Sequence, residues 1–323
     1  MKYFVTGATG FLGNVIVRQL LAQGHQTNIV VRSPDKAREL ESLGAKIFKG
    51  DVTDKESMRP AMQGMDGLFH VAGWYKIGAH DKSDGEKVNI QGTHNVLELM
   101  KEIGIRKGVY TSTLAVNSDT HGQLVDETYH FSGTHLSEYD RTKAVAHYIA
   151  RQFIANGLPL VIAMPGLIYG PGDTSSVRTS IIQYLQRKLP ILPRQTAMCW
   201  AHVEDVAKGH LLAMDKGKIG QSYHLAGEPY GLLDAYRLAQ EITGIPTPLA
   251  VSPRLVAVMS ILVKPFDRFV SESYTSEGLR IIAGATYIGD NSKARRELGF
   301  DPRPLRQGLE QTLRHEMTII DMK

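Results

Sequence analysis

The sequence predicts an α/β fold in which helices cover both faces of a parallel sheet. In the first half of the chain, short apolar runs with little polar alternation take turns with segments of helical periodicity. Glycines stand where these helices should end: Gly24, Gly44, Gly64, Gly104 and Gly157. This order is typical of a doubly wound, Rossmann-type sheet, and 323 residues are enough for one or two domains with a large core.

The elements follow one another in strand–helix units. The predicted strands cover residues 2–6, 27–32, 45–50, 67–72, 107–112 and 160–164. The helical segments between them cover residues 11–24, 34–44, 54–64, 86–104 and 137–157. A helix after Val203 and a strand at 221–227 repeat the unit once more, so both elements should belong to the domain that contains the sheet.

The pattern changes after Pro165, where prolines and glycines become frequent and the later sequence is mostly helical. We therefore expect two domains. Residues 1–166 and 196–228 should form the sheet domain, and residues 167–195 and 229–323 a smaller, mostly helical substrate domain.

Composition excludes several classes of function. The net charge of +4 comes from interspersed charges, which argues against a nucleic-acid partner. The single cysteine, Cys199, forms no internal disulfide; we expect a buried thiol and a cytoplasmic protein. Twelve scattered histidines without ligand spacing predict no metal.

The first residues make a poor signal peptide, and the longest apolar run, 255–263, is about half a membrane span. It predicts a packed helix and no membrane partner.

Three glycines lie between the first strand and the first helix, at Gly7, Gly10 and Gly13. Glycines there let the backbone approach a pyrophosphate, whose charge is stabilised at the helix N-terminus. The loop therefore predicts a dinucleotide site that also includes Thr9, Phe11 and Leu12. A glycine-rich turn without a ligand is the alternative.

The second strand ends in Arg32, where an NAD-binding fold normally carries a carboxylate. A guanidinium can hold a 2′-phosphate with charge-assisted hydrogen bonds, and Lys36 is close enough in sequence to help. We therefore expect NADP(H) rather than NAD(H). Asp51 and Val52, just past the third strand, suit the adenine amino group and ring; a turn aspartate is the alternative.

Two tyrosine–lysine pairs have the i, i+4 spacing that places both side chains on one face of a helix. One is Tyr139 with Lys143, in SEYDRTKA, where Ser137 and Asp140 form a capping box. The other is Tyr184 with Lys188, which follows the Pro–Gly loop and runs into Pro190. Spacing alone does not separate them, and we interpret the second as a surface pair.

The chain resembles the extended short-chain dehydrogenase/reductase family, also called the NAD-dependent epimerase/dehydratase family. The resemblance covers nearly the whole chain and rests on the order and spacing of these stretches: TGATGFLG, GDVTD, HVAG, VNIQGTHNVLE, YTSTLAV, YDRTK, PGLIYGPGD, AHVEDVA and KARRELGFDPRPLRQGLEQT. It implies Thr113, Tyr139 and Lys143 as catalytic residues, with Ser112 as the neighbour if the register differs by one. The phenol would act as proton donor, and the lysine would lower its pKa and hold the nicotinamide ribose.

The same resemblance implies further contacts. Cofactor contacts would come from Val71, Ala72, Gly73, Thr111, Pro165 and Ile168. Substrate contacts would come from Trp74, Tyr75 and Leu167, with the polar loop 117–136 as the family's substrate loop. The family also suggests a homodimer through residues 86–103 and 137–156.

Three departures help to choose among the reactions of the family. Leu114 and Ala115 replace the acidic pair of the dehydratases, Leu167 replaces the asparagine usual in sugar-nucleotide epimerases, and Arg32 matches the NADPH-dependent reductases similar to dihydroflavonol 4-reductase. The leading hypothesis is an NADPH-dependent reductase of a small-molecule ketone or aldehyde. A nucleotide-sugar epimerase is the first alternative, and an NADP-sensing binding protein is the second.

Overall fold

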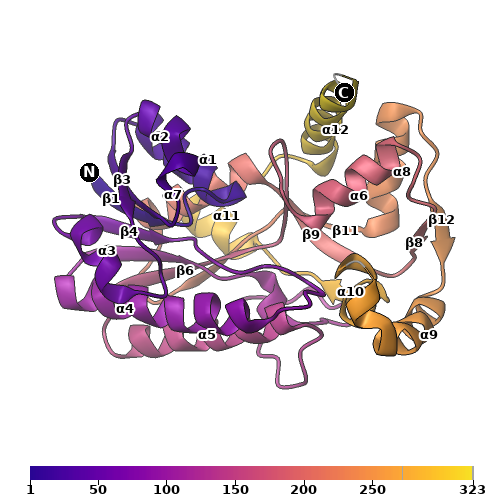
Figure 1. Cartoon of the computed structure of the whole chain (residues 1–323), viewed down its shortest axis with the longest axis horizontal. Coiled ribbons are helices and arrows are strands. Elements are labelled where there is room, and N and C mark those ends of the chain that lie inside the picture. Colours follow the sequence, from indigo (N-terminus) through magenta and orange to yellow (C-terminus); the bar gives the residue numbers. More distant parts are fainter. Residues whose placement is uncertain (271, 322–323) are drawn as a thin grey trace.

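A seven-stranded parallel sheet forms the larger part of the molecule (Figure 1). The structure is a computed structural model that describes residues 1–270 and 272–321. The strand order is β10-β6-β5-β4-β1-β2-β3. Its strands are β1 (Lys2–Thr6), β2 (Gln26–Val31), β3 (Lys46–Lys49), β4 (Gly67–His70), β5 (Lys107–Thr111), β6 (Leu160–Pro165) and β10 (Ser222–Leu225). The predicted doubly wound, Rossmann-type fold is confirmed.

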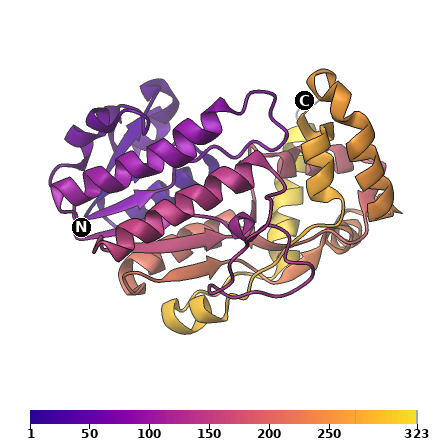
Figure 2. The ribbon, with the colours of Figure 1, turned by 90° about the horizontal axis from the view of Figure 1, so that it is seen from below.

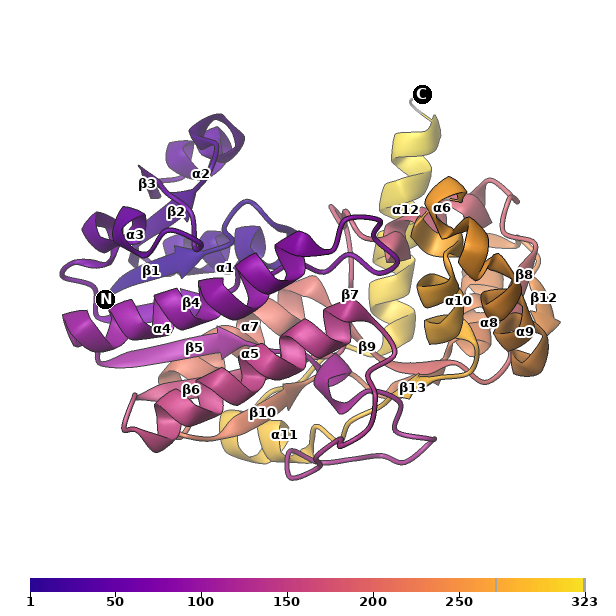
Figure 3. The ribbon, with the colours of Figure 1, turned by 60° about the horizontal axis from the view of Figure 1, so that its bottom comes forward.

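Helices cover both faces of this sheet because each turns one apolar stripe toward it. One face carries α1 (Phe11–Ala22), η1 (Pro34–Ala37), α2 (Arg38–Ser42), α7 (Val203–Lys216) and α11 (Ser292–Leu298). The other carries α3 (Lys55–Met62), α4 (Gly92–Ile103) and α5 (Glu138–Ala155), and α4 and α5 lie side by side (Figures 1 and 3). A π-helix, η2 (Gly85–Gln91), leads into α4.

The C-terminal part is built on a four-stranded sheet and a two-stranded one. Figure 2 shows its orange helices beyond one end of the seven-stranded sheet. The four-stranded sheet contains β7 (Leu167–Tyr169), β9 (Ala197–His202), β11 (Pro229–Gly231) and β13 (Thr286–Tyr287), and the two-stranded sheet contains β8 (Ile191–Pro193) and β12 (Leu249–Val251). The helices here are α6 (Ser176–Leu185), α8 (Leu232–Thr243), α9 (Pro253–Val263), α10 (Ser276–Ile282) and α12 (Leu305–Asp321), with η4 (Lys264–Phe269) and η5 (Glu272–Tyr274). Strand β9 pairs only within the smaller sheet, although its residues lie in a segment assigned to the sheet domain. The domain division itself stays a prediction.

The second tyrosine–lysine pair is not a surface pair, so that interpretation is wrong. Tyr184 is buried between α6 and α8; its hydroxyl donates to the carbonyl of Ile245 at 2.6 Å, and its ring packs edge-on against Tyr236. Helix α6 ends at Leu185, so Lys188 lies beyond it and is exposed. The apolar contacts of the tyrosine decided its position, which i, i+4 spacing cannot reveal.

The long apolar run is helical, as predicted, but it is only partly packed on the rest of the protein. Of the residues in α9, Val256 and Ser260 are buried, whereas Leu255, Ile261 and Leu262 are more than half exposed. No helix of residues 1–270 and 272–321 has both the length and the apolar character needed to cross a bilayer.

Candidate functional site

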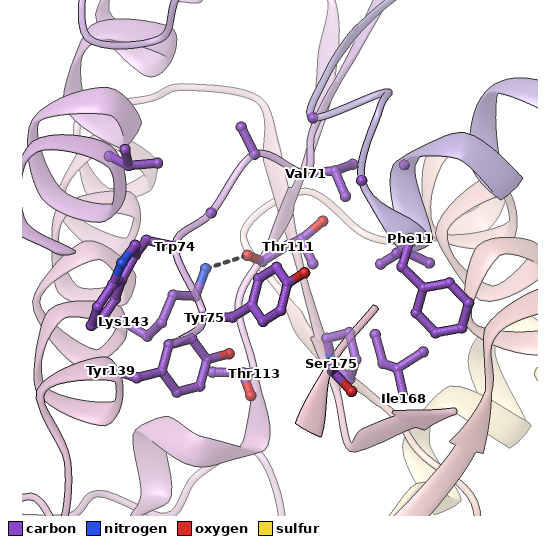
Figure 4. A pocket seen from close by; sticks show the side chains of 18 of the residues that line it. Phe11, Val71, Trp74, Tyr75, Thr111, Thr113, Tyr139, Lys143, Ile168 and Ser175 are labelled. Carbon is purple, nitrogen blue, oxygen red and sulfur yellow. Dashed lines mark hydrogen bonds between the residues drawn. The ribbon is translucent and has the colours of Figure 1, made fainter. Parts of the chain in front are cut away.

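A cavity of about 600 Å³ opens at the carboxyl ends of the central strands, on the switch point between β1 and β4. Every site residue predicted above lines it except Lys36. Figure 4 shows the side chains of Tyr139, Lys143 and Thr113 facing one part of the cavity and Phe11 and Ile168 facing another. The residues predicted from the sequence therefore come together around one cavity.

The glycine loop fits tightly against the backbone around it. Gly7 has φ +73°, and a Cβ there would lie 2.6 Å from the amide nitrogen of Ala72. A Cβ on Gly13 would overlap the carbonyl oxygen of Gly7. Gly10 precedes α1 without any side-chain cap, so the first N–H groups of the helix stay open toward the cavity. This cradle suits the pyrophosphate of a dinucleotide.

The replacement Gly13→Ala tests the cradle. The added methyl must displace the Gly7 carbonyl, so we expect NADPH binding to weaken at least about tenfold. This loss is expected even though alanine stabilises a helix by about 1 kcal/mol relative to glycine. Fluorescence titration with NADPH measures the change, and Asn14→Ala, one residue further along α1, is the matched control. Unchanged affinity in Gly13→Ala would show that the ligand does not lie on this loop.

One buried cluster ties the glycine strand to the neighbouring strand, and sequence reasoning missed it. The Thr6 hydroxyl accepts the N–H groups of Val71 and Ala72, both at 3.1 Å, and lies 2.8 Å from Nδ1 of His70. Burial lowers the pKa of His70 to about 3, so the ring is neutral at pH 7. The cluster fixes the two loops that face the cavity; the alternation of polar and apolar residues gave no sign of it.

The far end of the cavity carries Arg32 and Asp51. Arg32 is 76% exposed in its side chain, and its Nε lies 3.8 Å from the Asp51 carboxylate. Asp51 also accepts the N–H and hydroxyl of Thr53, so the alternative of a turn aspartate holds as well. Lys36 is exposed on η1 and is absent from the lining of the cavity as the structure describes it. The short helical turn carries Lys36 away from the strand end.

The tyrosine–lysine pair lies at the middle of the cavity. The Lys143 ammonium donates to the carbonyl of Thr111 at 2.7 Å (Figure 4). It also donates to the Tyr110 hydroxyl at 3.3 Å and lies over the Tyr110 ring. Thr113 caps η3 (Leu114–Asn117), where its oxygen accepts the N–H of Ala115 at 3.1 Å. Its own proton is left to donate into the cavity.

Burial controls the protonation of this pair. It lowers the pKa of Lys143 to about 7 and raises that of the Tyr139 phenol to about 12, against a smaller lowering from Thr113. Without a cofactor, burial therefore outweighs any lowering of the Tyr139 pKa by Lys143, whose ammonium is directed at the Thr111 carbonyl; the expected lowering with the oxidised cofactor bound stays a prediction. A tyrosine in this state keeps its proton at neutral pH and can donate it.

Helix α5 is anchored at its first turn. The Ser137 hydroxyl accepts the N–H of Asp140 at 3.0 Å, which confirms Ser137 as the cap. The Asp140 carboxylate accepts the hydroxyl of Tyr287, at 3.0 Å, from strand β13. Burial raises the pKa of Asp140 to about 6, against lowering by the hydrogen bonds from Ser137 and Tyr287. The C-terminal part is thus tied to the start of the helix that carries Tyr139.

Asn89 positions the segment after β4 and was not predicted. Its amide oxygen accepts the N–H of Trp74 at 2.7 Å, and its amide nitrogen donates to the Trp74 carbonyl and to the Thr142 hydroxyl, at 2.9 and 3.0 Å. It therefore joins the cavity wall to helix α5 next to Lys143. The stretch VNIQGTHN carries this residue, so the resemblance contained a signal that spacing arguments did not use.

The other end of the cavity is lined mostly by apolar and aromatic side chains. Trp74 is buried, and Tyr75 is 49% exposed, with its hydroxyl 3.1 Å from that of Thr174. Apolar and aromatic residues that also line the cavity are Ile77, Val88, Leu167, Val177, Met198, Ile281 and Tyr287, and the polar ones include Asp84, Asp140, Asp173, Thr174, Ser175 and Ser176. None of the residues 117–136 lines the cavity as the structure describes it, so the substrate loop stays a prediction; Val125 pairs with Gly289, and the Glu127 carboxylate accepts the N–H of His224.

Ser112 is the alternative to Thr113. Its hydroxyl lies 2.9 Å from Nδ1 of His147, on the side of helix α5. The hydroxyl of Thr113 and the phenol of Tyr139 lie close to each other in Figure 4. The geometry therefore favours the register with Thr113.

Comparisons with known proteins show which family and fold this chain shares. The family described as the NAD dependent epimerase/dehydratase family matches residues 3–226. A putative dihydroflavonol 4-reductase of Synechocystis sp. is 33% identical over 320 residues, covering 95% of this chain and 92% of that one. Sterol demethylase protein B of Methylococcus capsulatus is 31% identical over 315 residues and 95% of both chains. A UDP-glucuronic acid 4-epimerase mutant of Bacillus cereus, solved with a fluorinated UDP-sugar and NAD, has a TM-score of 0.80 at 20% identity, over 99% of this chain and 100% of that one, which shows a shared fold.

Proposed function

Because this chain belongs to the NAD dependent epimerase/dehydratase family, and so is an NAD(P)-dependent oxidoreductase acting on CH–OH or C=O groups, we propose that it is an NADPH-dependent reductase of an apolar ketone or aldehyde. One observation carries the proposal. Thr113, Tyr139 and Lys143 lie between a glycine cradle at one end of the cavity and an apolar chamber at the other. A carbonyl compound in the chamber would reach both hydroxyls.

The three side chains divide the work as their protonation allows. Bound NADPH would supply the hydride. The Thr113 hydroxyl donates to the carbonyl oxygen as negative charge develops on it. Tyr139, whose pKa is about 12, still holds its proton at neutral pH and transfers it to that oxygen, which leaves the product as an alcohol. Lys143 would hold the nicotinamide ribose.

The apolar chamber argues against a nucleotide-sugar substrate. Among the described residues that line the cavity, the positively charged ones are Arg32 and Lys143, both needed at the cofactor. A second pyrophosphate would be left without a cation, which costs binding energy when its charge is taken out of water. Arg178 on α6 is no substitute, because it is held by both carboxylate oxygens of buried Glu316, at 2.7 and 3.0 Å.

The relatives' names agree with an apolar substrate. Dihydroflavonol 4-reductase and sterol demethylase protein B are named for compounds without a nucleotide, and Leu167 lies in the chamber wall. The test incubates the protein with NADPH and a panel of apolar ketones and aldehydes, and in parallel with UDP- and dTDP-sugars. We expect loss of the reduced-nicotinamide absorbance with ketones or aldehydes. Sugar interconversion without net cofactor consumption would establish an epimerase, and tight NADPH binding with neither reaction would favour a sensor.

The proposed preference for NADP(H) rests on Arg32. Its exposed guanidinium can hold a 2′-phosphate, and Arg32→Asp should repel that group; we expect NADPH affinity to fall about 10- to 100-fold and NADH affinity to change by less than about threefold. Titrations with both cofactors measure this. Lys36→Ala is the control, because Lys36 lies outside the described lining and should change neither affinity. Equal effects of Arg32→Asp on both cofactors would contradict the assignment.

We also propose a homodimer through α4 and α5, which lie side by side on one face of the molecule (Figure 3). Half-buried Val145 and Ile149 and exposed Tyr148 supply apolar surface on α5. Light scattering on the purified protein should give twice the mass of the chain. A monomer at all accessible concentrations would remove this proposal.

A further inference from the structure

Figures 1 and 3 show helix α9 at the outer edge of the C-terminal part, far from the central sheet. Helix α9 and η4 together carry an exposed apolar surface. We call it the α9 patch. It comprises these exposed residues of α9 and η4: Leu255, Val258, Met259, Ile261, Leu262, Phe266 and Phe269. Their exposed fractions run from 37% for Met259 to 71% for Ile261 and Phe269. A group of exposed apolar side chains this close together in the sequence is typical of an interaction site.

The helix under the patch is held firmly from one side only. Val256 and Ser260 are buried, and α9 packs against α10. Asp267 of η4 accepts the N–H and hydroxyl of Ser276 at the start of α10, at 2.7 and 2.6 Å. The apolar side chains therefore face outward from a fixed backbone and not from a frayed segment.

The charges beside the patch are mostly positive. Arg254, Lys264 and Arg268 are exposed, and Asp267 is the sole acidic residue of the stretch 252–270. The Asp267 carboxylate accepts both hydrogen bonds from Ser276. Burial raises its pKa, but these bonds and the charges of Lys82 and His80 lower it more, so the carboxylate stays negatively charged and offsets one of the three positive charges. Among the ion pairs of the described residues, none involves Arg254, Lys264 or Arg268. The surface is thus apolar and positively charged.

We propose that the α9 patch docks on a membrane surface that carries anionic headgroups. Apolar side chains flanked by arginine and lysine are the composition that lies in a bilayer interface. The electrostatic attraction between each basic side chain and an anionic lipid surface strengthens the binding further. The sequence predicted no membrane partner because the run is too short to span; docking in the plane of the interface needs no span.

A second copy of the chain fits the patch less well. In a two-fold interface the same patch meets itself, which would bring Arg254, Lys264 and Arg268 of both copies together. Like charges placed together oppose association. An anionic lipid surface neutralises them instead, so the charge pattern favours the lipid.

The patch lies one helix away from the cavity. Helix α10, on which α9 packs, contributes Ile281 to the apolar chamber. A protein docked through α9 would hold that chamber close to the membrane surface. The docking inference does not depend on the proposed reductase, since it is measured without cofactor or substrate.

Co-sedimentation with vesicles tests the proposal. The full chain should bind phosphatidylcholine vesicles that contain phosphatidylglycerol, bind pure phosphatidylcholine vesicles much more weakly, and be released by high salt. The variant R254Q/K264Q/R268Q should bind the anionic vesicles on the order of 100-fold more weakly, at about fivefold for each basic residue. The variant I261E/L262E should lose sedimentation, while its thermal unfolding stays unchanged because both side chains are exposed.

The matched control is L124E/I219E, which places the same charges at two apolar residues that are 56% and 57% exposed elsewhere. It should sediment like the wild type. The proposal is overturned if the wild-type chain does not bind anionic vesicles at low salt. It is equally overturned if I261E/L262E binds normally, or if that variant only converts a dimer to a monomer in light scattering.

Discussion

Replacing Tyr139 by phenylalanine is expected to lower the turnover number for ketone reduction by about 10²- to 10⁴-fold, the range of a lost general acid. The phenol points into the cavity beside Thr113, and its raised pKa makes it a proton donor at neutral pH (Figure 4). Phenylalanine keeps the ring and its packing. NADPH affinity should therefore stay within about threefold, because the glycine cradle is untouched.

Tyr148→Phe is the matched control for this variant. Tyr148 lies on the same helix, α5, but 62% of it is exposed, so its loss should leave turnover unchanged. Initial rates at saturating NADPH, with fluorescence titration of the cofactor, measure both effects. Full turnover by Tyr139→Phe would remove the assignment of the proton donor.

Replacing Lys143 by methionine is expected to abolish most of the activity and to stabilise the fold. Burial lowers the pKa of Lys143 from its ordinary 10.5 to about 7. Between these values the folded protein binds fewer protons than the unfolded chain, so wild-type stability should rise as pH increases from 7 to 10.5. At pH 7 the burial of this amine lowers the free energy of unfolding of the wild type by about 4 kcal/mol. Lys143→Met removes that cost but also loses the hydrogen bond to Thr111, which is worth about 1–2 kcal/mol. The free energy of unfolding of the variant should therefore be higher by about 2–3 kcal/mol.

Denaturant unfolding from pH 7 to 10 measures this effect as the difference between wild type and variant. Lys143→Met should lack the rise with pH that the wild type shows. Lys188→Met is the control, because Lys188 is exposed and should give neither the stabilisation nor a changed slope. Parallel pH curves for wild type and Lys143→Met would show that Lys143 is not buried as described.

The doubly wound sheet could be predicted because its signals are local. Apolar strands, helical periodicity and glycines at helix ends placed each of the strands β1 to β6 within two residues of its observed ends. The pairing of β9 with β7, β11 and β13 could not be predicted, since three of these four strands have two or three residues and pair across long sequence separations. Short strands carry little pattern of their own.

The end of the cavity that is lined by the glycine loop and Arg32 was predictable for the same reason, because Gly7, Gly13 and Arg32 lie directly at strand and helix ends. The apolar chamber was not, because Met198, Ile281 and Tyr287 reach it from three separate segments. Tyr184 shows the same limit from the other side: its spacing to Lys188 matched that of Tyr139 to Lys143, yet tertiary packing buried it away from the cavity. Residues that meet only through folding need the structure to be found.

Isotope transfer in a single turnover tests the central claim most directly. The protein is mixed with NADPH that carries deuterium at the transferred position of the nicotinamide, and with an apolar ketone or aldehyde from the panel. The account predicts an alcohol that carries one deuterium on its carbinol carbon, formed in equal amount to NADP⁺ and lost in Tyr139→Phe. The account is contradicted if no carbonyl compound of the panel gives a deuterated alcohol, while a parallel mixture with a UDP- or dTDP-sugar gives the epimeric sugar nucleotide without release of NADP⁺.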